Sequence, residues 1–160
     1  MTDEGFREFV ETRYGELLRT AFLLTGTHHA AEDLLQSSLL RLMDRWHSVD
    51  EPKNYLYRIM ANQRVSVWRR LGARELLTDS LPVRTTPDTA DAVVQRDELL
   101  SALDRLPARM RTVLVLRYWL DYSEADTAAM LGCSVGSVKS QASRGLAKLR
   151  TRLTGQEVLA

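Results

Sequence analysis

One stretch in the C-terminal part decides how the chain folds. Residues 123–144 read Ser-Glu-Ala-Asp-Thr-Ala-Ala-Met-Leu-Gly-Cys-Ser-Val-Gly-Ser-Val-Lys-Ser-Gln-Ala-Ser-Arg. Ser123 and Asp126 have the spacing of a capping box at a helix start, and Gly132 can take the left-handed conformation that ends a helix. Ser134 is suited to cap the helix that follows. Two helices joined by a glycine turn predict a helix-turn-helix.

The second helix of this motif has two different faces. Its apolar side chains recur at helical spacing and are expected to face inward: Val135, Val138, Ala142, Leu146 and Leu149. The opposite face is polar and basic, with no acidic residue from 136 to 152, which is typical of a helix that enters the DNA major groove. The candidate DNA contacts are Ser134, Ser137, Lys139, Ser140, Gln141, Arg144 and Lys148. The alternative is a helical hairpin whose basic face is only solvated.

The rest of the chain is also predicted to be helical. Apolar residues recur three and four apart, and no stretch alternates as a strand does. The pattern predicts helices at about 4–24, 28–46 (capped by Thr27), 52–71, 91–106, 107–120, 123–131 and 134–153. Between about residues 74 and 91 the rhythm is lost, and threonines and prolines accumulate. We therefore expect an all-α fold of two small helical domains, residues 1–73 and 93–160, joined by a flexible linker at 74–92.

Charged residues are unevenly distributed although the total is nearly balanced. The 160 residues include 22 Lys+Arg and 21 Asp+Glu, for a formal net charge of +1. Residues 52–75 contain six bases and one acid, and residues 105–160 contain nine bases and four acids, whereas 1–51 and 76–104 are acidic. Two basic segments are expected for two nucleic-acid contacts, because clustered Lys and Arg neutralise phosphates. Chance clustering on solvated helix faces is the alternative.

Composition and missing motifs exclude several classes of protein. The single cysteine, Cys133, rules out a disulfide framework and a multi-cysteine zinc site. His28 and His29 are adjacent and so point to different sides of a helix, and no metal site is predicted. No apolar run is long enough to cross a bilayer, and the N-terminus is acidic, unlike a secretory signal. No Gly-rich phosphate loop or Cys/His dyad is present; we expect no enzyme, no cofactor, no membrane insertion and a cytoplasmic location.

A second polar cluster follows Pro52. Residues 54–70 mix Arg and Asn with Tyr55, Tyr57 and Trp68, a composition suited to unstacked single-stranded bases. Taken singly, these residues have a simpler structural interpretation: Tyr55, Leu56, Ile59 and Met60 are expected in the helical core, and Trp46 is expected to close the helical bundle.

Together these motifs resemble the small, two-domain extracytoplasmic-function class of bacterial RNA polymerase sigma factors. The resemblance spans about residues 6–71 and 97–152. Ala31-Glu-Asp-Leu-Leu-Gln resembles the polymerase-binding helix of the family, and Pro52 to Arg70 resembles its segment for the −10 promoter element. The part from Leu106-Pro107 onward resembles the domain that recognises the −35 element.

The resemblance implies a non-catalytic subunit that binds core RNA polymerase and directs it to specific promoters. The residues that bind the clamp helices of the largest polymerase subunit would be Asp33, Gln36, Leu40 and Arg41. The −10 strand would be held by Asn62, Arg64, Ser66, Trp68, Arg69 and Arg70, with a flipped base captured near Asn62. The C-terminal domain would lie on the flap of the second-largest subunit and read −35 duplex DNA. Family members are often held by an anti-sigma factor that covers both domains, but no residue of this sequence identifies such a partner.

Four positions depart from the family pattern: Ser37, Leu39, Gln141 and Gly145. Two other functions remain as alternatives. A response regulator or repressor could use the same C-terminal module, but it would need a receiver or ligand domain, and residues 1–72 contain no strand pattern. An adaptor that sequesters another factor would not need two basic segments. The linker would also permit the two domains to pack together and bury their polymerase-facing surfaces, which would be an inhibited arrangement.

Overall fold

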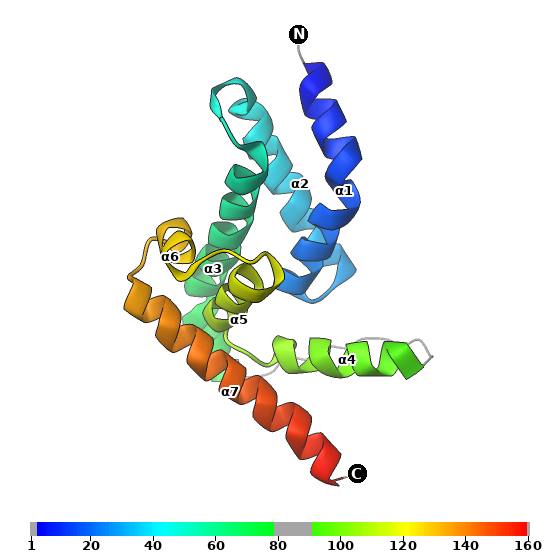
Figure 1. Ribbon diagram of the computed structural model, residues 1–160, viewed down its shortest axis with the longest axis vertical. Coiled ribbons are helices and arrows are strands. Elements are labelled where there is room, and N and C mark those ends of the chain that lie inside the picture. Colours follow the sequence, from blue (N-terminus) through cyan, green and yellow to red (C-terminus); the bar gives the residue numbers. More distant parts are fainter. Residues whose placement is uncertain (1–2, 79–90, 160) are drawn as a thin grey trace.

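A computed structural model describes residues 3–78 and 91–159, with side chains described for residues 4–66 and 97–154. The elements are α1 (Asp3–Thr25), α2 (His28–Asp44), the 3-10 helix η1 (Trp46–Ser48), α3 (Pro52–Thr78), α4 (Asp91–Asp104), α5 (Ala108–Leu114), the π-helix η2 (Val115–Trp119), α6 (Glu124–Leu131) and α7 (Val135–Leu159). The described residues contain no strand, so the predicted all-α fold class is confirmed. Figure 1 shows α1, α2 and α3 as one bundle and α4 to α7 gathered beside its lower end.

The N-terminal bundle is built on a leucine-rich core. Its fully buried side chains include Leu17, Leu24, Leu35, Leu42, Leu56 and Met60. Trp46 closes the far end as expected, because its ring contacts Phe6 and Phe9 at centroid distances of 5.5 Å. Burying aromatic and leucine side chains on one face of each helix is what holds three helices of this length together.

The turn between α1 and α2 has the predicted cap. Thr27 is extended, and its Oγ1 accepts a hydrogen bond of 3.1 Å from the backbone N–H of Ala30. Gly26 before it has a φ of +103°, a conformation that side chains with a Cβ rarely adopt. The chain therefore reverses sharply between the two helices.

The helix-turn-helix has the predicted details. Ser123 Oγ accepts from the N–H of Asp126 at 2.9 Å, and Ser134 Oγ accepts from the N–H of Ser137 at 3.0 Å. Gly132 is left-handed, with a φ of +68° and a ψ of +39°. These three local predictions are confirmed, since each depends only on neighbours along the chain.

Val135 is the exception on the inner face of α7. It was expected to face inward, but it is 39% exposed, whereas Val138 and Ala142 are buried. Val135 is the first residue of α7, and helical side chains lean toward the N-terminal end of their helix. Its side chain therefore leans past the start of the helix and away from the core.

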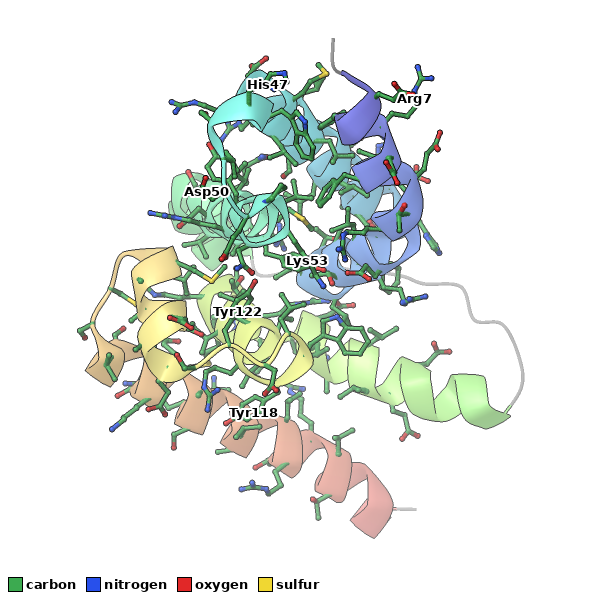
Figure 2. The ribbon with its side chains drawn as sticks, turned by 45° about the horizontal axis from the view of Figure 1, so that its top comes forward. Arg7, His47, Asp50, Lys53, Tyr118 and Tyr122 are labelled. Carbon is green, nitrogen blue, oxygen red and sulfur yellow. The ribbon has the colours of Figure 1, made fainter. Side chains whose placement is uncertain are left out.

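The two halves of the chain pack directly against each other. Helix α3 contacts α5 and α6, and α1 contacts α5 and η2. Val115 of η2 belongs to the same buried cluster as the core of the N-terminal bundle, and Leu120, Tyr122 and Met130 pack against that cluster. Figure 2 shows Lys53 and Tyr122 at this boundary. The two halves are thus packed together, as the linker would permit.

The segment expected as a linker is only partly described. Helix α3 continues to Thr78 and α4 begins at Asp91, so residues 74–78, expected in the linker, are helical. Residues 79–90 lie outside the described part of the chain.

Candidate nucleic-acid and partner interfaces

The outer face of α7 is polar, basic and accessible. Lys139, Ser140, Arg144 and Lys148 are exposed, and Ser137 and Gln141 are half-buried. Ser134 is exposed too, but its hydroxyl already caps the helix, so its role in the turn is structural. The ion pair between Lys139 Nζ and Glu124 Oε1 is long, at 4.0 Å, and solvent-exposed. Such a pair contributes little, so Lys139 can turn toward a phosphate at little cost.

Gly145 brings α7 close to α5. A Cβ on Gly145 would lie 3.0 Å from Leu114 Cδ1 and 3.3 Å from its Cγ. The departure from the family pattern at this position therefore coincides with a tight contact between the inner face of α7 and α5. It does not lie on the outer face.

The candidate polymerase-binding residues share one open face of α2. Asp33, Gln36, Leu40 and Arg41 are all exposed. Leu40 is 59% exposed, and Met43, one turn further on, is 44% exposed. The buried stripe of α2 ends at Leu42. An exposed leucine and methionine at this spacing form an apolar surface that suits a helical partner.

Two further departures from the family pattern, Ser37 and Leu39, lie on the inner side of α2. Leu39 is buried in the core, and Ser37 Oγ is 2.8 Å from Gln63 Oε1 on α3. Neither side chain belongs to the outward face of α2. Ser37 and Leu39 can therefore affect the binding of a partner only through the packing of α2 on α3.

Two of the candidate −10 residues on α3, Asn62 and Arg64, are engaged within the protein. Asn62 Nδ2 donates to the carbonyl of Arg58 at 3.0 Å and to the carbonyl of Met130 on α6 at 2.7 Å. Arg64 Nε donates to the carbonyl of Leu24 at 3.0 Å, near the end of α1, where helix carbonyls lack internal partners. Ser66 is exposed. The side chains of Trp68, Arg69 and Arg70 lie outside the described ones.

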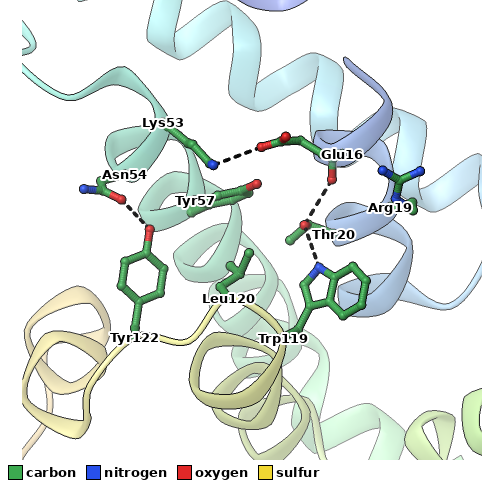
Figure 3. Close-up of a pocket in the computed structure, with 9 residues that line it drawn as sticks. All are labelled: Glu16, Arg19, Thr20, Lys53, Asn54, Tyr57, Trp119, Leu120 and Tyr122. Atoms are coloured by element: carbon green, nitrogen blue, oxygen red, sulfur yellow. Dashed lines mark hydrogen bonds and ion pairs between the residues drawn. The ribbon is translucent and has the colours of Figure 1, made fainter. Parts of the chain in front are cut away.

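A polar seam joins the segment around η2 to the N-terminal bundle (Figure 3). Trp119 Nε1 donates to Thr20 Oγ1 on α1 at 3.1 Å, and the Tyr122 hydroxyl donates to Asn54 Oδ1 on α3 at 2.5 Å. Between them lies a pocket of about 450 Å³, which Lys53 also lines. Lys53 Nζ is 3.1 Å from Glu16 Oε2.

Burial at the seam changes the chemistry of its tyrosines. Loss of solvent is the main cause that raises the pKa of Tyr122 to about 12, and the nearby Tyr57 hydroxyl adds to it. Burial likewise raises the pKa of Tyr57. Both hydroxyls therefore stay protonated at neutral pH, and Tyr122 remains a hydrogen-bond donor. Nothing in the sequence marked this seam, because its partners come from segments far apart in the chain.

A buried arginine holds the same two halves together at a second place. Arg111 of α5 is 3% exposed. Its Nε donates to the carbonyl of Leu23 at 2.5 Å, and its Nη1 pairs with Asp104 Oδ1 at 2.5 Å. Burial lowers the pKa of Arg111 and Asp104 opposes that change. Arg111 and Arg64 thus reach adjacent carbonyls near the C-terminal end of α1, where positive charge is favourable.

Two classes of site are not found in the described part of the chain. Among the described side chains, no group of three or more His, Cys, Asp or Glu could hold a metal ion. No described helix combines the length and apolarity needed to span a bilayer.

The chain forms two helical bundles, and the C-terminal one contains a capped helix-turn-helix with a basic outer helix face. These features are typical of DNA-binding proteins of the helix-turn-helix class. Residues 9–74 match the family Sigma-70 region 2, and residues 96–149 match Sigma-70, region 4. The RNA polymerase sigma-E factor of Streptomyces coelicolor is 38% identical over 156 residues, which cover 96% of this chain and 88% of that protein. This chain belongs to the extracytoplasmic-function (ECF) group of RNA polymerase sigma factors, and is therefore a transcription initiation factor and not an enzyme.

Further relatives agree over nearly the whole length. The ECF RNA polymerase sigma factor SigM of Mycobacterium tuberculosis is 34% identical, over 94% of this chain and 78% of that protein. Among solved structures, the sigma factor RpoE in complex with the anti-sigma factor NepR from Bartonella quintana is similar with a TM-score of 0.74 and 26% identity. That match covers 94% of this chain and 98% of RpoE, so the likeness extends over both bundles.

Proposed function

We propose that this sigma factor binds core RNA polymerase and directs it to promoters through two separate DNA contacts. In this proposal residues 1–73 form the domain for the clamp and the −10 strand, 74–92 form the linker, and 93–160 form the domain for the −35 duplex. Inside the cell, in the cytoplasm, both domains act together only when the polymerase sets their spacing, because two weak contacts on one rigid carrier gain effective concentration.

The observation that carries the −35 contact is the open basic face of α7. Lys139, Arg144 and Lys148 are exposed on it, and it follows a capped turn of the kind that places a recognition helix in the major groove. The arginine and lysines supply phosphate contacts or guanine contacts, and Ser137, Ser140 and Gln141 supply polar groups beside them.

The clamp contact is assigned to the exposed face of α2, and the −10 contact to α3. Leu40 would supply the apolar anchor, with Asp33, Gln36 and Arg41 around it. On α3, Asn62 would capture a flipped base, whereas Arg64, Ser66, Trp68, Arg69 and Arg70 would hold the strand. Flipping a base costs a few kcal/mol, so these contacts must be made with the displaced strand to keep the DNA open.

We also propose that an anti-sigma factor controls this chain. Its structural relative RpoE is solved in complex with one, NepR, and the likeness covers both bundles.

The test is reconstitution with core RNA polymerase, followed by run-off transcription from a library of random promoters. We expect promoter-dependent transcripts that require the added chain. The variant Lys139→Ala/Arg144→Ala should reduce −35 duplex binding and lower the slope of log K against log salt by about 0.9 for each lost phosphate contact. Arg7→Ala, an exposed base on α1, is the matched control and should change neither. A chain that binds duplex DNA tightly but gives no transcript with core polymerase would be a repressor.

A further inference from the structure

The pocket at the polar seam is separate from the DNA and polymerase contacts proposed above. It has a volume of about 450 Å³ and is lined by residues of α1, α3 and the segment from Trp119 to Tyr122 (Figure 3). That volume lies within the range of small-molecule sites, about 300–1,000 Å³. None of the candidate DNA or polymerase contacts is among the described residues that line it. The pocket is therefore a second kind of site on this chain.

The lining of the pocket carries more positive than negative charge. Arg19 and Lys53 are its two bases, and Glu16 is its one acid. Glu16 Oε2 is already shared by two cations, because Lys53 Nζ lies 3.1 Å from it and Arg13 Nη1 lies 3.7 Å from it. Burial raises the pKa of both lining tyrosines, so neither adds a negative charge at neutral pH. The pocket is therefore suited to an anion.

Arg19 is the cation that is available to such an anion. Within the described part of the chain, no side chain or carbonyl pairs with its guanidinium. Arg19 directly precedes Thr20, whose Oγ1 accepts a hydrogen bond of 3.1 Å from Trp119 Nε1. That bond holds the indole ring beside the pocket, and Trp119 nevertheless stays 51% exposed. A guanidinium and an open aromatic ring thus lie at the same end of the pocket (Figure 3).

These two groups together specify the chemistry of a ligand. A guanidinium binds a carboxylate or a phosphate through parallel N–H donors, and an exposed indole face stacks on another flat ring. An exposed arginine without such surroundings would only be a solvated charge. We propose that the pocket binds a small aromatic anion, with its carboxylate or phosphate on Arg19 and its ring on Trp119.

A ligand in this place contacts both halves of the chain. Arg19 belongs to α1, whereas Trp119 is the last residue of η2. A ligand that binds only the packed halves stabilises that arrangement by mass action. The pocket is thus a site at which a small molecule acts on the sigma factor directly, and the inference does not depend on the proposed DNA and polymerase contacts.

Four probes of similar size separate the charge of the ligand from its ring. Benzoate and phenyl phosphate are aromatic anions, cyclohexanecarboxylate is an anion without an aromatic ring, and benzamide is an aromatic ring without a charge. The readout is the indole N–H signal of Trp119 in heteronuclear NMR spectra of the full chain, assigned with the variant Trp119→Phe. The signal of Trp46 is the internal control, because that ring packs on Phe6 and Phe9 at the far end of the N-terminal bundle.

We expect benzoate or phenyl phosphate to shift the Trp119 signal with a dissociation constant on the order of 1 mM, as is usual for ligands of about ten heavy atoms. The anion that binds more tightly identifies the acidic group, and the Trp46 signal should not move. Cyclohexanecarboxylate and benzamide should each bind at least about threefold more weakly than that anion. The midpoint of thermal unfolding should rise with the concentration of the bound anion.

Arg19→Gln should weaken binding of the preferred anion at least about fivefold, because a charge-assisted hydrogen bond is lost. Arg7→Gln is the matched control, since Arg7 is an exposed base on the same helix and does not line the pocket. It should change the dissociation constant less than about twofold.

Three outcomes would overturn the proposal. If neither aromatic anion moves the Trp119 signal at concentrations up to about 20 mM, the pocket is not a site for this class of ligand. Equal affinities of the parent and Arg19→Gln would remove the anion from Arg19, and equal affinities for benzoate and cyclohexanecarboxylate would remove the ring from Trp119. Because these measurements use neither DNA nor polymerase, they can fail while promoter-dependent transcription succeeds.

Discussion

Gly26 and Asp104 meet across the boundary between the two bundles. A Cβ on Gly26 would lie 2.6 Å from Asp104 Oδ1, and 3.6 Å from Arg111 Nη1. Asp104 is held in that place by Arg111, which also bonds to the carbonyl of Leu23. The turn after α1 is therefore shaped by its backbone conformation and by a contact with the other half of the chain.

Gly26→Ala should destabilise the protein. Its φ of +103° is unfavourable for a residue with a Cβ, at a cost of about 1–2 kcal/mol, and Asp104 must also leave Arg111. The measurement is the free energy of unfolding in urea. Asp104→Ala has a cost of its own, because it leaves the buried Arg111 without its carboxylate. Measured in that background, Gly26→Ala should show only the backbone part of the loss.

Gly15→Ala is the matched control for that change. Gly15 is an exposed position in α1, and a Cβ there would meet nothing within 4 Å. Alanine should stabilise the helix by about 0.5–1 kcal/mol. Equal effects of alanine at positions 15 and 26 would contradict the contact between Gly26 and Asp104.

Arg111→Met should lower the free energy of unfolding by about 1.5–3 kcal/mol, because a charge-assisted bond to the Leu23 carbonyl is lost. Methionine fills much of the space but cannot donate a hydrogen bond. Arg109→Met, on the same helix, is the control and should cost little. If the two variants unfold at the same urea concentration, the buried arginine contributes nothing to packing of the halves.

Gly145→Val should destabilise the C-terminal bundle by about 1–3 kcal/mol through overpacking against Leu114. Gly136→Val in the same helix is the comparison, because a Cβ there would have only Ser134 Oγ near it, at 3.8 Å. Thermal unfolding of both variants measures the difference. Leu114→Ala should recover part of the loss at position 145 and none at position 136.

High pH should weaken the closed arrangement through Tyr122. Its pKa is raised to about 12 from the ordinary 10, so the neutral hydroxyl is favoured when the seam is formed. The stabilisation is fully present below pH 10 and is lost as the pH rises from 10 to 12. Absorbance of tyrosinate should show a late-titrating group that disappears in Tyr122→Phe. A titration that is the same in both proteins would contradict the buried hydroxyl.

Local features of the fold were predictable because their causes are local. The caps at Thr27, Ser123 and Ser134 and the left-handed Gly132 each depend on residues within a few positions. The exposed faces of α2 and α7 also follow from helical spacing. Val135 was assigned to the wrong side, because it lies at the edge of a stripe, where spacing alone cannot tell whether a neighbouring helix covers it.

The hydrogen-bond partners of the α3 residues could not be predicted from local spacing. Asn62 is a polar residue beside a basic run, and that pattern is equally compatible with an outward amide. Its bond to Met130 spans 68 positions along the chain. Arg111, Trp119 and Tyr122 gave no signal, since each bonds to a residue on a helix far from it in sequence.

By itself, the order of residues was enough to predict two helical bundles and a helix-turn-helix, because caps, glycine turns and apolar spacing act over one or two helical turns. The family came instead from the resemblance of three motifs in the chain to those of known sigma factors, which the comparisons then confirmed. Only the tertiary structure decided that the bundles close on each other, and that Asn62 is hydrogen-bonded to α6 whereas the outward faces of α2 and α7 stay exposed. The physical reason is that hydrogen bonds between distant segments form only after the helices have packed, and no local pattern encodes which faces meet.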